Sequence, residues 1–273
     1  MKEKISLAGD LGSGKSTVST ILIERLGAEY YHTGALVRAA AEKRGMTIGE
    51  LNVYMETHPE IDNEIDDGLK ALASVDKFLV IDSRMAWHFT AGTFKIYLST
   101  DIETSSIRIM NAKRKGEHAS TLEETMTQTA ERRVSETKRY LEQYGVNITD
   151  LSNYSLVVDT SFATPDEIAD CICAAFEEWK QNKDYRRAFI SPERLNFPER
   201  EADGEMISAL AARLEMGEEI QIPEIVEDNG EFYLVSGFES AMAYSISFSP
   251  FIPANLVGAG KPAGEFVKMK NSL

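Results

Sequence analysis

The amino-acid sequence predicts an α/β protein in which helices flank a mainly parallel sheet, followed by a small α+β region. The first observation is a glycine-rich loop after a short apolar run, and the second is a series of apolar runs separated by helix-patterned segments. The third is a change of pattern after a polar, charged stretch at residues 180–187, beyond which short strands and turns predominate. Alternating strands and helices are typical of a parallel sheet covered on both faces.

The first strand is expected at residues 5–8, and the loop after it reads GDLGSGKST at residues 9–17. The pattern G-x-x-x-x-G-K-[ST] between a strand and a helix is typical of a phosphate-binding loop. Lys15 can reach the β- and γ-phosphates of a nucleoside triphosphate, and the Ser16 hydroxyl can ligate Mg²⁺. The N-terminus of the following helix attracts the same anion. We expect the donor phosphates to contact Gly9, Gly12, Ser13, Gly14, Lys15, Ser16 and Thr17.

The remaining elements follow from apolar runs, helix caps and turn residues. Nearly continuous apolar runs predict further strands at residues 78–82, 94–98 and 155–158. Helix starts are indicated where a serine or threonine precedes a glutamate by three positions, at Thr47, Ser120 and Thr164. Later elements are a strand at 189–190, a helix at about 202–216, a hairpin turning at 228–230, a short helix after Gly237 and a strand at 252–257. We expect one domain at residues 1–182 and a second at 187–273.

Separated arginines distinguish phosphoryl transfer from other uses of a phosphate-binding loop. Arg38 follows Thr33 and Gly34 at the start of a helical stretch. Arg84 stands just beyond a strand that ends at Asp82, at the sheet edge where ligands bind. Transfer between two anions needs such cations because catalysis is mostly positioning and charge neutralisation. Asp82 is a candidate Mg²⁺ ligand, although a strand-end carboxylate without a metal role is the alternative.

Arg132, Glu136 and Arg139 have the spacing i, i+4 and i+7, which places all three on one face of a predicted helix. An ordinary surface pair is the alternative for Arg132 and Glu136. Their position behind the phosphate-binding loop favours contact with the phosphates, with Lys15, Arg132 and Arg139 as the candidate catalytic cations.

Composition restricts the function further. The net charge of −15, from 29 basic and 44 acidic side chains, argues against a nucleic-acid-binding surface. Cys171 and Cys173 stand two apart in a helix-patterned segment, which suits neither a disulfide nor a zinc site and indicates a reduced compartment. Apolar stretches are too short to span a membrane, so we expect a cytoplasmic protein.

Residues 1 to about 180 resemble the archaeal-type cytidylate kinases, a group of P-loop nucleoside monophosphate kinases. The segments that carry the resemblance are GDLGSGKST (9–17), HTGALVR (32–38), KRGM (43–46), HPEID (58–62), VIDSRMA (80–86), SETKRY (135–140) and YSLVVDTS (154–161). The resemblance implies a P-loop kinase core, an acceptor-binding insert near residues 34–75 and a lid near 112–131. It implies ATP and Mg²⁺ as cofactors and CMP or dCMP as the acceptor. The residues implied to bind the acceptor or serve the lid are Thr33, Gly34, Arg38, Arg84, Arg132, Glu136 and Arg139.

The chain differs from the family pattern near the acceptor. Asp67-Gly68-Leu69 replaces a basic, glutamine-containing stretch, and Ser83 replaces a glycine. A kinase of another small acceptor on the same scaffold is therefore one alternative function. A catalytically weak ATP-binding regulator is the other, and the intact Lys15-Ser16 pair argues against it.

The C-terminal part more weakly resembles ParB-like domains of the sulfiredoxin fold. The segments ISPERL (190–195), IPEIV (222–226), YLVSG (233–237) and IPA (252–254) carry this resemblance. The family's nucleotide-handling G-H-x-R reads Gly237-Phe238-Glu239-Ser240 here, without the histidine and the arginine. We therefore expect no nucleotide site in this region, which suits protein contact, regulation or structural support.

Overall fold

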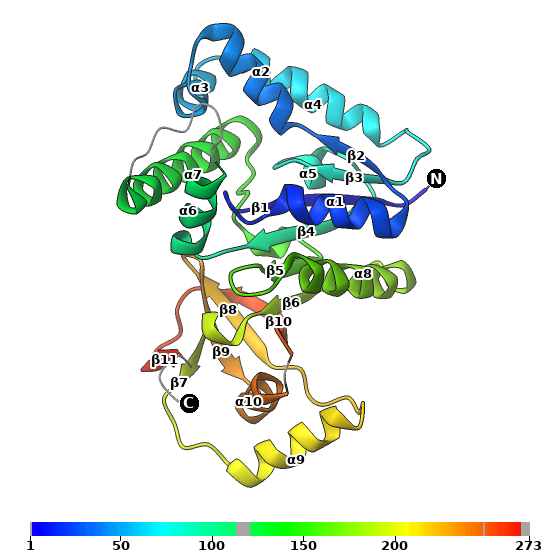
Figure 1. The fold of residues 1–273 in the computed structure, drawn as a ribbon, viewed down its shortest axis with the longest axis vertical. Coiled ribbons are helices and arrows are strands. Elements are labelled where there is room, and N and C mark those ends of the chain that lie inside the picture. Colours follow the sequence, from blue (N-terminus) through cyan, green and yellow to red (C-terminus); the bar gives the residue numbers. More distant parts are fainter. Residues whose placement is uncertain (1, 113–120, 248, 269–273) are drawn as a thin grey trace.

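In the computed structural model, residues 2–112, 121–247 and 249–268 are described, and their strands form one 11-stranded sheet (Figure 1). The strand order is β11-β7-β9-β8-β10-β6-β5-β4-β1-β3-β2. In the N-terminal part the strands are β1 (Lys4–Gly9), β2 (Glu29–His32), β3 (Leu79–Asp82), β4 (Phe94–Ser99) and β5 (Leu156–Asp159), all paired in parallel. The structure confirms the predicted α/β fold with a parallel sheet flanked by helices.

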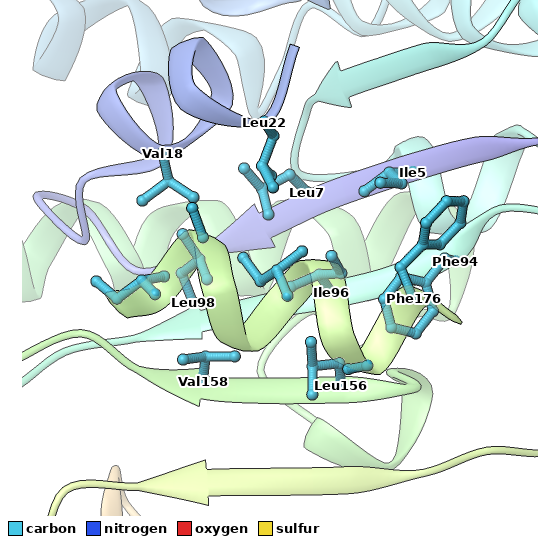
Figure 2. Packing of buried hydrophobic residues seen from close by; sticks show 14 of the residues in the cluster. Ile5, Leu7, Val18, Leu22, Phe94, Ile96, Leu98, Leu156, Val158 and Phe176 are labelled. Carbon is cyan, nitrogen blue, oxygen red and sulfur yellow. The ribbon is translucent and has the colours of Figure 1, made fainter. Parts of the chain in front are cut away.

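Helices cover both faces of this parallel part. The helices of this part are α1 (Lys15–Leu26), α2 (Gly34–Arg44), α3 (Ile48–Met55), α4 (Glu60–Leu72), α5 (Ala86–Phe89), α6 (Ile102–Asn111), α7 (Leu122–Tyr144) and α8 (Pro165–Gln181). Of these, α2 and α3 pack on each other and on α4 and α7. On one face α1 and α8 pack on β1, β4 and β5, and Figure 2 shows Leu22 and Phe176 among the sheet residues of this core. On the other face α4, α5 and α7 pack against β3. Among the described residues, no helix is long and apolar enough to cross a membrane.

Local sequence signals explain where several helices begin. Capping boxes at Thr47 and Thr164 start α3 and α8 as predicted, with the side chain of each accepting from the backbone three positions on. The predicted start at Ser120 was wrong by one residue, because Thr121 caps α7 and pairs with Glu124. The sequence holds two overlapping boxes there, and Ser120 itself lies outside the described residues.

Three strands were missed by the sequence analysis: the edge strands β2 and β11 and the interior strand β7 (Leu195–Pro198). β2 is a four-residue edge strand with the sequence EYYH, which shows no apolar run. The strand predicted at 252–257 is β10 (Ile252–Ala259), and β11 (Phe266–Lys268) follows it at the other edge of the sheet. Short edge strands carry a weak hydrophobic pattern because much of their surface faces solvent.

The C-terminal part continues the same sheet. β6 (Arg187–Ile190) pairs in parallel with β5, and β10 pairs antiparallel with β6 and in parallel with β8. Its other elements are β7 (Leu195–Pro198), α9 (Gly204–Glu215), β8 (Glu224–Asp228), β9 (Glu231–Ser236) and α10 (Phe238–Ile246). The predicted hairpin turn is confirmed: Asn229 and Gly230 both have positive φ between β8 and β9. The boundary expected at residues 182–187 lies between α8 and β6, and the sheet runs across it.

Candidate active site

A cavity of about 200 Å³ lies at the carboxyl ends of β1, β2 and β3, between the phosphate-binding loop, helices α2–α4 and helix α7. This is the edge at which parallel sheets bind ligands. It brings together every predicted site residue except Gly9. Those that line it are Gly12, Ser13, Gly14, Lys15, Ser16, Thr17, Thr33, Gly34, Arg38, Asp82, Arg84, Arg132, Glu136 and Arg139.

Glycine is required in the phosphate-binding loop because other backbone lies close to it. A Cβ at Gly9 would lie 2.4 Å from the Leu98 carbonyl oxygen, and one at Gly12 would lie 2.5 Å from that of Ser105. Gly12 and Gly14 also have φ values of 71° and 83°, which disfavour other residues. The loop therefore packs tightly on β4 and α6 while turning toward the N-terminus of α1.

Gly9 lies behind the cavity, and its backbone carbonyl binds two of the cations that line the cavity, Lys15 and Arg84. Its carbonyl oxygen accepts hydrogen bonds from Lys15 Nζ at 3.1 Å and from the Arg84 guanidinium. Lys15 Nζ also donates to the Asp10 carbonyl at 2.9 Å. Burial, together with the positive charge of Arg84, lowers the pKa of Lys15 to about 8. A phosphate beside Lys15 would favour its charged form again.

Glu136 joins two arginines from different elements. Its carboxylate forms an ion pair with Arg84, from the end of β3, and accepts from Arg132 Nε at 2.9 Å on its own helix. Burial alone would raise the pKa of Glu136, but Arg84, Arg132 and Arg139 outweigh it and lower the pKa to about 2. Glu136 is therefore ionised at neutral pH. The predicted shared face of Arg132, Glu136 and Arg139 is confirmed, since all three line the cavity.

Arg139 lies deeper and joins α7 to the acceptor-side helices. Its Nε lies 3.0 Å from Asp62 Oδ2 in an ion pair in which both side chains are 4% exposed. Its Nη1 donates to the carbonyl and side-chain oxygens of Asn52 at 3.2 and 3.3 Å. Burial raises the pKa of Asp62 to about 6, against the opposite effect of Arg139.

Arg38 differs from these arginines. It lies on α2, is exposed and lines the cavity, and within the described residues its guanidinium has no hydrogen-bond or ion-pair partner. Gly34 lies directly beneath it, since a Cβ there would lie 3.4 Å from Arg38 Nη1. Among the described residues, no protein group uses the guanidinium N–H donors of Arg38, so they are available to a ligand in the cavity.

The candidate Mg²⁺ ligands Ser16 and Asp82 both line the cavity. Tyr30, on β2, donates from its hydroxyl to Asp82 Oδ2 at 3.0 Å. Burial and the charge of Asp82 raise the pKa of Tyr30 to about 12, which keeps its proton in place. The described residues contain no cluster of three or more metal-ligating His, Cys, Asp or Glu side chains. One carboxylate and one hydroxyl suit Mg²⁺, which keeps several waters and takes phosphate oxygens as ligands.

Sequence reasoning missed several polar residues of the site. Asn52 and Asp66 line the cavity, and the Asn52 side-chain nitrogen is buried without a hydrogen-bond partner in the described structure. The Asp66 carboxylate accepts from the Tyr144 hydroxyl, and burial raises its pKa. Asp62 and Asp66 stand four apart and share one face of α4, but the exposed Glu60 and Glu64 have the same spacing, so no local signal indicates which pair is buried.

Asp10 and Arg108 support the site from outside the cavity. Asp10 accepts from the Tyr97 hydroxyl at 2.7 Å and from the Thr100 backbone at 3.0 Å, and it pairs with Arg133 at 3.0 Å. Arg108 donates to the Thr160 carbonyl at 2.7 Å. Residues 113–120 of the expected lid, with the basic run Lys113-Arg114-Lys115, lie outside the described residues, and residues 122–131 form the first turns of α7.

The chain is similar in sequence to several known proteins. A cytidylate kinase from Thermoplasma volcanium is 36% identical over 186 residues, covering 67% of this chain and 95% of that protein. A cytidylate kinase from Pyrococcus furiosus is 37% identical over 174 residues, covering 63% and 88%. An S-adenosylmethionine-dependent nucleotide dehydratase from Lacinutrix mariniflava is 37% identical over 179 residues, covering 65% of this chain but only 37% of that protein.

The region of similarity coincides with the part of the chain that builds the cavity. A profile of the Cytidylate kinase-like family matches residues 4–162, from the start of β1 to just beyond β5. That span contains the phosphate-binding loop, Arg38, Arg84 and the Arg132–Glu136–Arg139 face. With more than half of its length matched, the chain belongs to the Cytidylate kinase-like family.

Proposed function

We propose that the protein transfers a phosphoryl group from ATP to a nucleoside monophosphate, with CMP or dCMP as the acceptor. The observation that carries this proposal is a cavity lined by residues 11–17 of the phosphate-binding loop on one side and, on the other, by Arg38, which is unpaired among the described residues. A kinase needs cations at both the donor and the acceptor phosphates, since its catalysis is mainly positioning and charge neutralisation.

On the donor side, Lys15 and the backbone amides at the start of α1 would hold the β- and γ-phosphates. Ser16 and Asp82 would hold Mg²⁺, and Tyr30 fixes the orientation of the Asp82 carboxylate. The bound Mg²⁺ would neutralise charge on the phosphate oxygens. Lys15 exchanges its hydrogen bonds with Gly9 and Asp10 for bonds to phosphate when the donor binds.

On the acceptor side, Arg38 and Arg84 would bind the monophosphate. Arg132 and Arg139 are proposed to act on the transferring phosphate from α7. The contacts of Arg139 with Asp62 and Asn52 favour a further role, in which it sets the position of α3 and α4 relative to α7. No general base is required, because the oxygen of a monophosphate is already anionic at neutral pH.

The acceptor-side wall supports a cytosine base over a uracil base. Carboxylates accept hydrogen bonds, and cytosine offers an amino group at the position where uracil carries an oxygen. Asp62 and Asp66 supply carboxylates. The Asn52 amide nitrogen, buried without a partner among the described residues, is a donor that either base could accept from, so it does not distinguish the two. Leu69 is apolar and also lines the cavity. It belongs to the stretch Asp67-Gly68-Leu69 that differs from the family pattern, and this difference favours the alternative of another small acceptor.

The proposal is tested by measuring ADP formation with CMP, dCMP, UMP, AMP, GMP and a panel of small hydroxy compounds. We expect the highest kcat/KM with CMP or dCMP and roughly 5- to 150-fold less with UMP, since one mispaired polar group costs about 1–3 kcal/mol. If a hydroxy compound is phosphorylated and no nucleoside monophosphate is, that compound class is the acceptor and the proposed CMP or dCMP acceptor is wrong. Tight ATP binding without turnover of any compound would favour a regulatory ATP-binding protein.

A further inference from the structure

A buried ion pair joins the C-terminal part of the chain to the end of β5. Arg194 follows β6 and is 3% exposed, while Asp159 ends β5 and is fully buried. Arg194 Nη1 lies 3.8 Å from Asp159 Oδ1 and donates to Ser161 Oγ at 3.0 Å. Arg194 Nη2 donates to the Gly230 carbonyl at 2.6 Å, so Arg194 also connects the β8–β9 turn to the end of β5.

Ser161 is the centre of this connection. Its hydroxyl donates to Asp159 Oδ1 at 2.6 Å and accepts from Arg194 and from the Asp101 backbone at 3.1 Å. A serine hydroxyl offers one donor and two acceptor positions, so its capacity is filled. The second oxygen of Asp159 accepts from the Ser191 backbone at 3.2 Å, again from the C-terminal part. The loop after β5 is thus fixed by groups from both parts of the chain.

From Ser161 the contacts lead directly to the phosphate-binding loop. Asp101 caps α6 by accepting from the Thr104 backbone at 2.8 Å. One turn later, the Ser105 carbonyl lies so close to Gly12 that a Cβ there would be 2.5 Å away. Arg108, also on α6, donates to the Thr160 carbonyl. Helix α6 and the loop after β5 therefore form one hydrogen-bonded support behind Gly12.

We infer that Arg194 is a positioning residue for the ATP site, through which the C-terminal part of the chain supports the phosphate-binding loop. Arg194 lies outside the residues matched to the family and does not line the cavity, so it would act through Ser161 and α6. The effect should fall on ATP and much less on the acceptor, because α2, α3 and α4 lie on the other side of the cavity. This inference rests on the proposed use of the loop for ATP.

The test compares R194M, R194K and the double variant D159N/R194M with R213M in the full-length protein. Arg213 is a matched control, since it lies on α9 and its described partners are exposed groups just beyond that helix. The dissociation constant of ATP–Mg²⁺ is measured by calorimetry, and kcat and both KM values are measured by ADP formation. Circular dichroism and thermal unfolding establish which variants are folded.

We expect R194M to weaken ATP binding roughly threefold to thirtyfold, with the acceptor KM changed less than twofold, and R194K to recover part of the loss. R213M should match the wild type. Unchanged ATP affinity in folded R194M, or equal loss for both substrates, would overturn the inference.

Where R194M does not fold, the other variants decide the question. The double variant removes both buried charges, and R194K keeps the positive charge with a different shape. Weakened ATP binding in either folded variant supports the inference, and wild-type ATP affinity in both overturns it. ATP binding by the wild type without turnover would contradict only the proposed kinase activity, because calorimetry still compares the variants.

Discussion

Arg38 and Arg194 belong to two regions that use positive charge differently. Arg38 is exposed at the cavity and has no partner among the described residues, whereas Arg194 is buried against Asp159, Ser161 and Gly230. Arg38 lies on α2, which follows β2, and Arg194 lies between β6 and β7. The donors of Arg38 are therefore open to a ligand, whereas Nη1 and Nη2 of Arg194 already donate to protein groups.

The donor side of the cavity is intermediate between these two cases, because its cations line the cavity and also contact protein groups. Lys15 and Arg84 both donate to the Gly9 carbonyl, and Arg84 shares the Glu136 carboxylate with Arg132. The hydrogen bonds described for Lys15 go to neutral carbonyl groups, whereas the charge of Arg194 is paired with that of Asp159 at the end of β5. A phosphate entering the cavity therefore meets a cluster of positive charge in a protein whose net charge is −15.

The largest expected effect is that of Lys15→Ala, which removes the cation at the donor phosphates. We expect a loss of about 2–4 kcal/mol of transition-state stabilisation, or roughly 30- to 1000-fold in kcat, with the fold preserved. Steady-state kinetics and circular dichroism provide the measurement. Lys77→Ala is the control, since Lys77 pairs with Glu29 on the surface. If the Lys15 variant turns over at the wild-type rate, the phosphate-binding loop does not bind the donor phosphates as proposed.

Glu136→Gln tests whether the cavity cations depend on one shared carboxylate. The pKa of Glu136 is about 2 in the folded protein and ordinarily 4.5, so its stabilisation is complete above pH 4.5 and is lost as the pH falls toward 2. We expect urea unfolding at pH 7 to show a loss of roughly 3 kcal/mol, which shrinks below pH 4.5.

Glu142→Gln, on the exposed side of the same helix, is the control and should be nearly neutral. A stability difference between the wild type and Glu136→Gln that does not change from pH 7 to pH 3 would contradict the linkage.

Arg38→Ala tests whether this exposed cation serves the acceptor. Loss of a hydrogen bond to a charged group costs about 1.5–3 kcal/mol, so we expect kcat/KM for the acceptor to fall about 10- to 100-fold. ATP binding by calorimetry should change little. An ammonium group would not reproduce the planar, two-pronged contact of a guanidinium, so Arg38→Lys should recover activity only in part. Arg44→Ala on the same helix is the control, because Arg44 bonds to the Ala40 carbonyl. An equal loss of ATP affinity would contradict the proposal that Arg38 binds the acceptor rather than ATP.

Arg84→Ala sharpens the same comparison, because Arg84 is both a cavity cation and a partner of Glu136. We expect it to lower the acceptor kcat/KM as Arg38→Ala does and, unlike Arg38→Ala, to lower the free energy of unfolding by about 3 kcal/mol. Kinetics and urea unfolding on the same preparations separate the two effects. A stable Arg84 variant would show that the pair with Glu136 contributes little to the fold.

The smallest effect is expected from Tyr30→Phe, which removes the hydrogen bond to Asp82. A loss of about 0.5–1.5 kcal/mol of Mg²⁺ binding should raise the Mg²⁺ concentration that gives half the maximal rate by roughly twofold to tenfold. A Mg²⁺ titration at saturating ATP measures this change. Tyr31→Phe is the matched control, since Tyr31 packs with β3 and α4 on the opposite face of β2. Identical titrations for both variants would argue against Asp82 as the metal-side carboxylate.

Much of the site could be predicted from the sequence because its parts are local. The phosphate-binding loop, the caps at Thr47 and Thr164 and the turn at Asn229 depend on residues within a few positions of one another. The parallel strands were predicted because strands buried on both faces are almost wholly apolar. The edge strand β2 lacks that signal, and the resemblance of the C-terminal part to ParB-like domains stays a prediction.

The sequence by itself determined that this chain carries a phosphate-binding loop, a parallel α/β core and a row of candidate cations behind it. Only the tertiary structure decided which cations are available. Glu136 meets Arg84 across 52 residues, and Arg194 meets Asp159 across 35, so neither pairing has a local signal. The continuity of the sheet from β5 into β6 is likewise a long-range contact. Short-range patterns fix elements and turns, whereas the partner of a long, charged side chain depends on which elements the fold brings together.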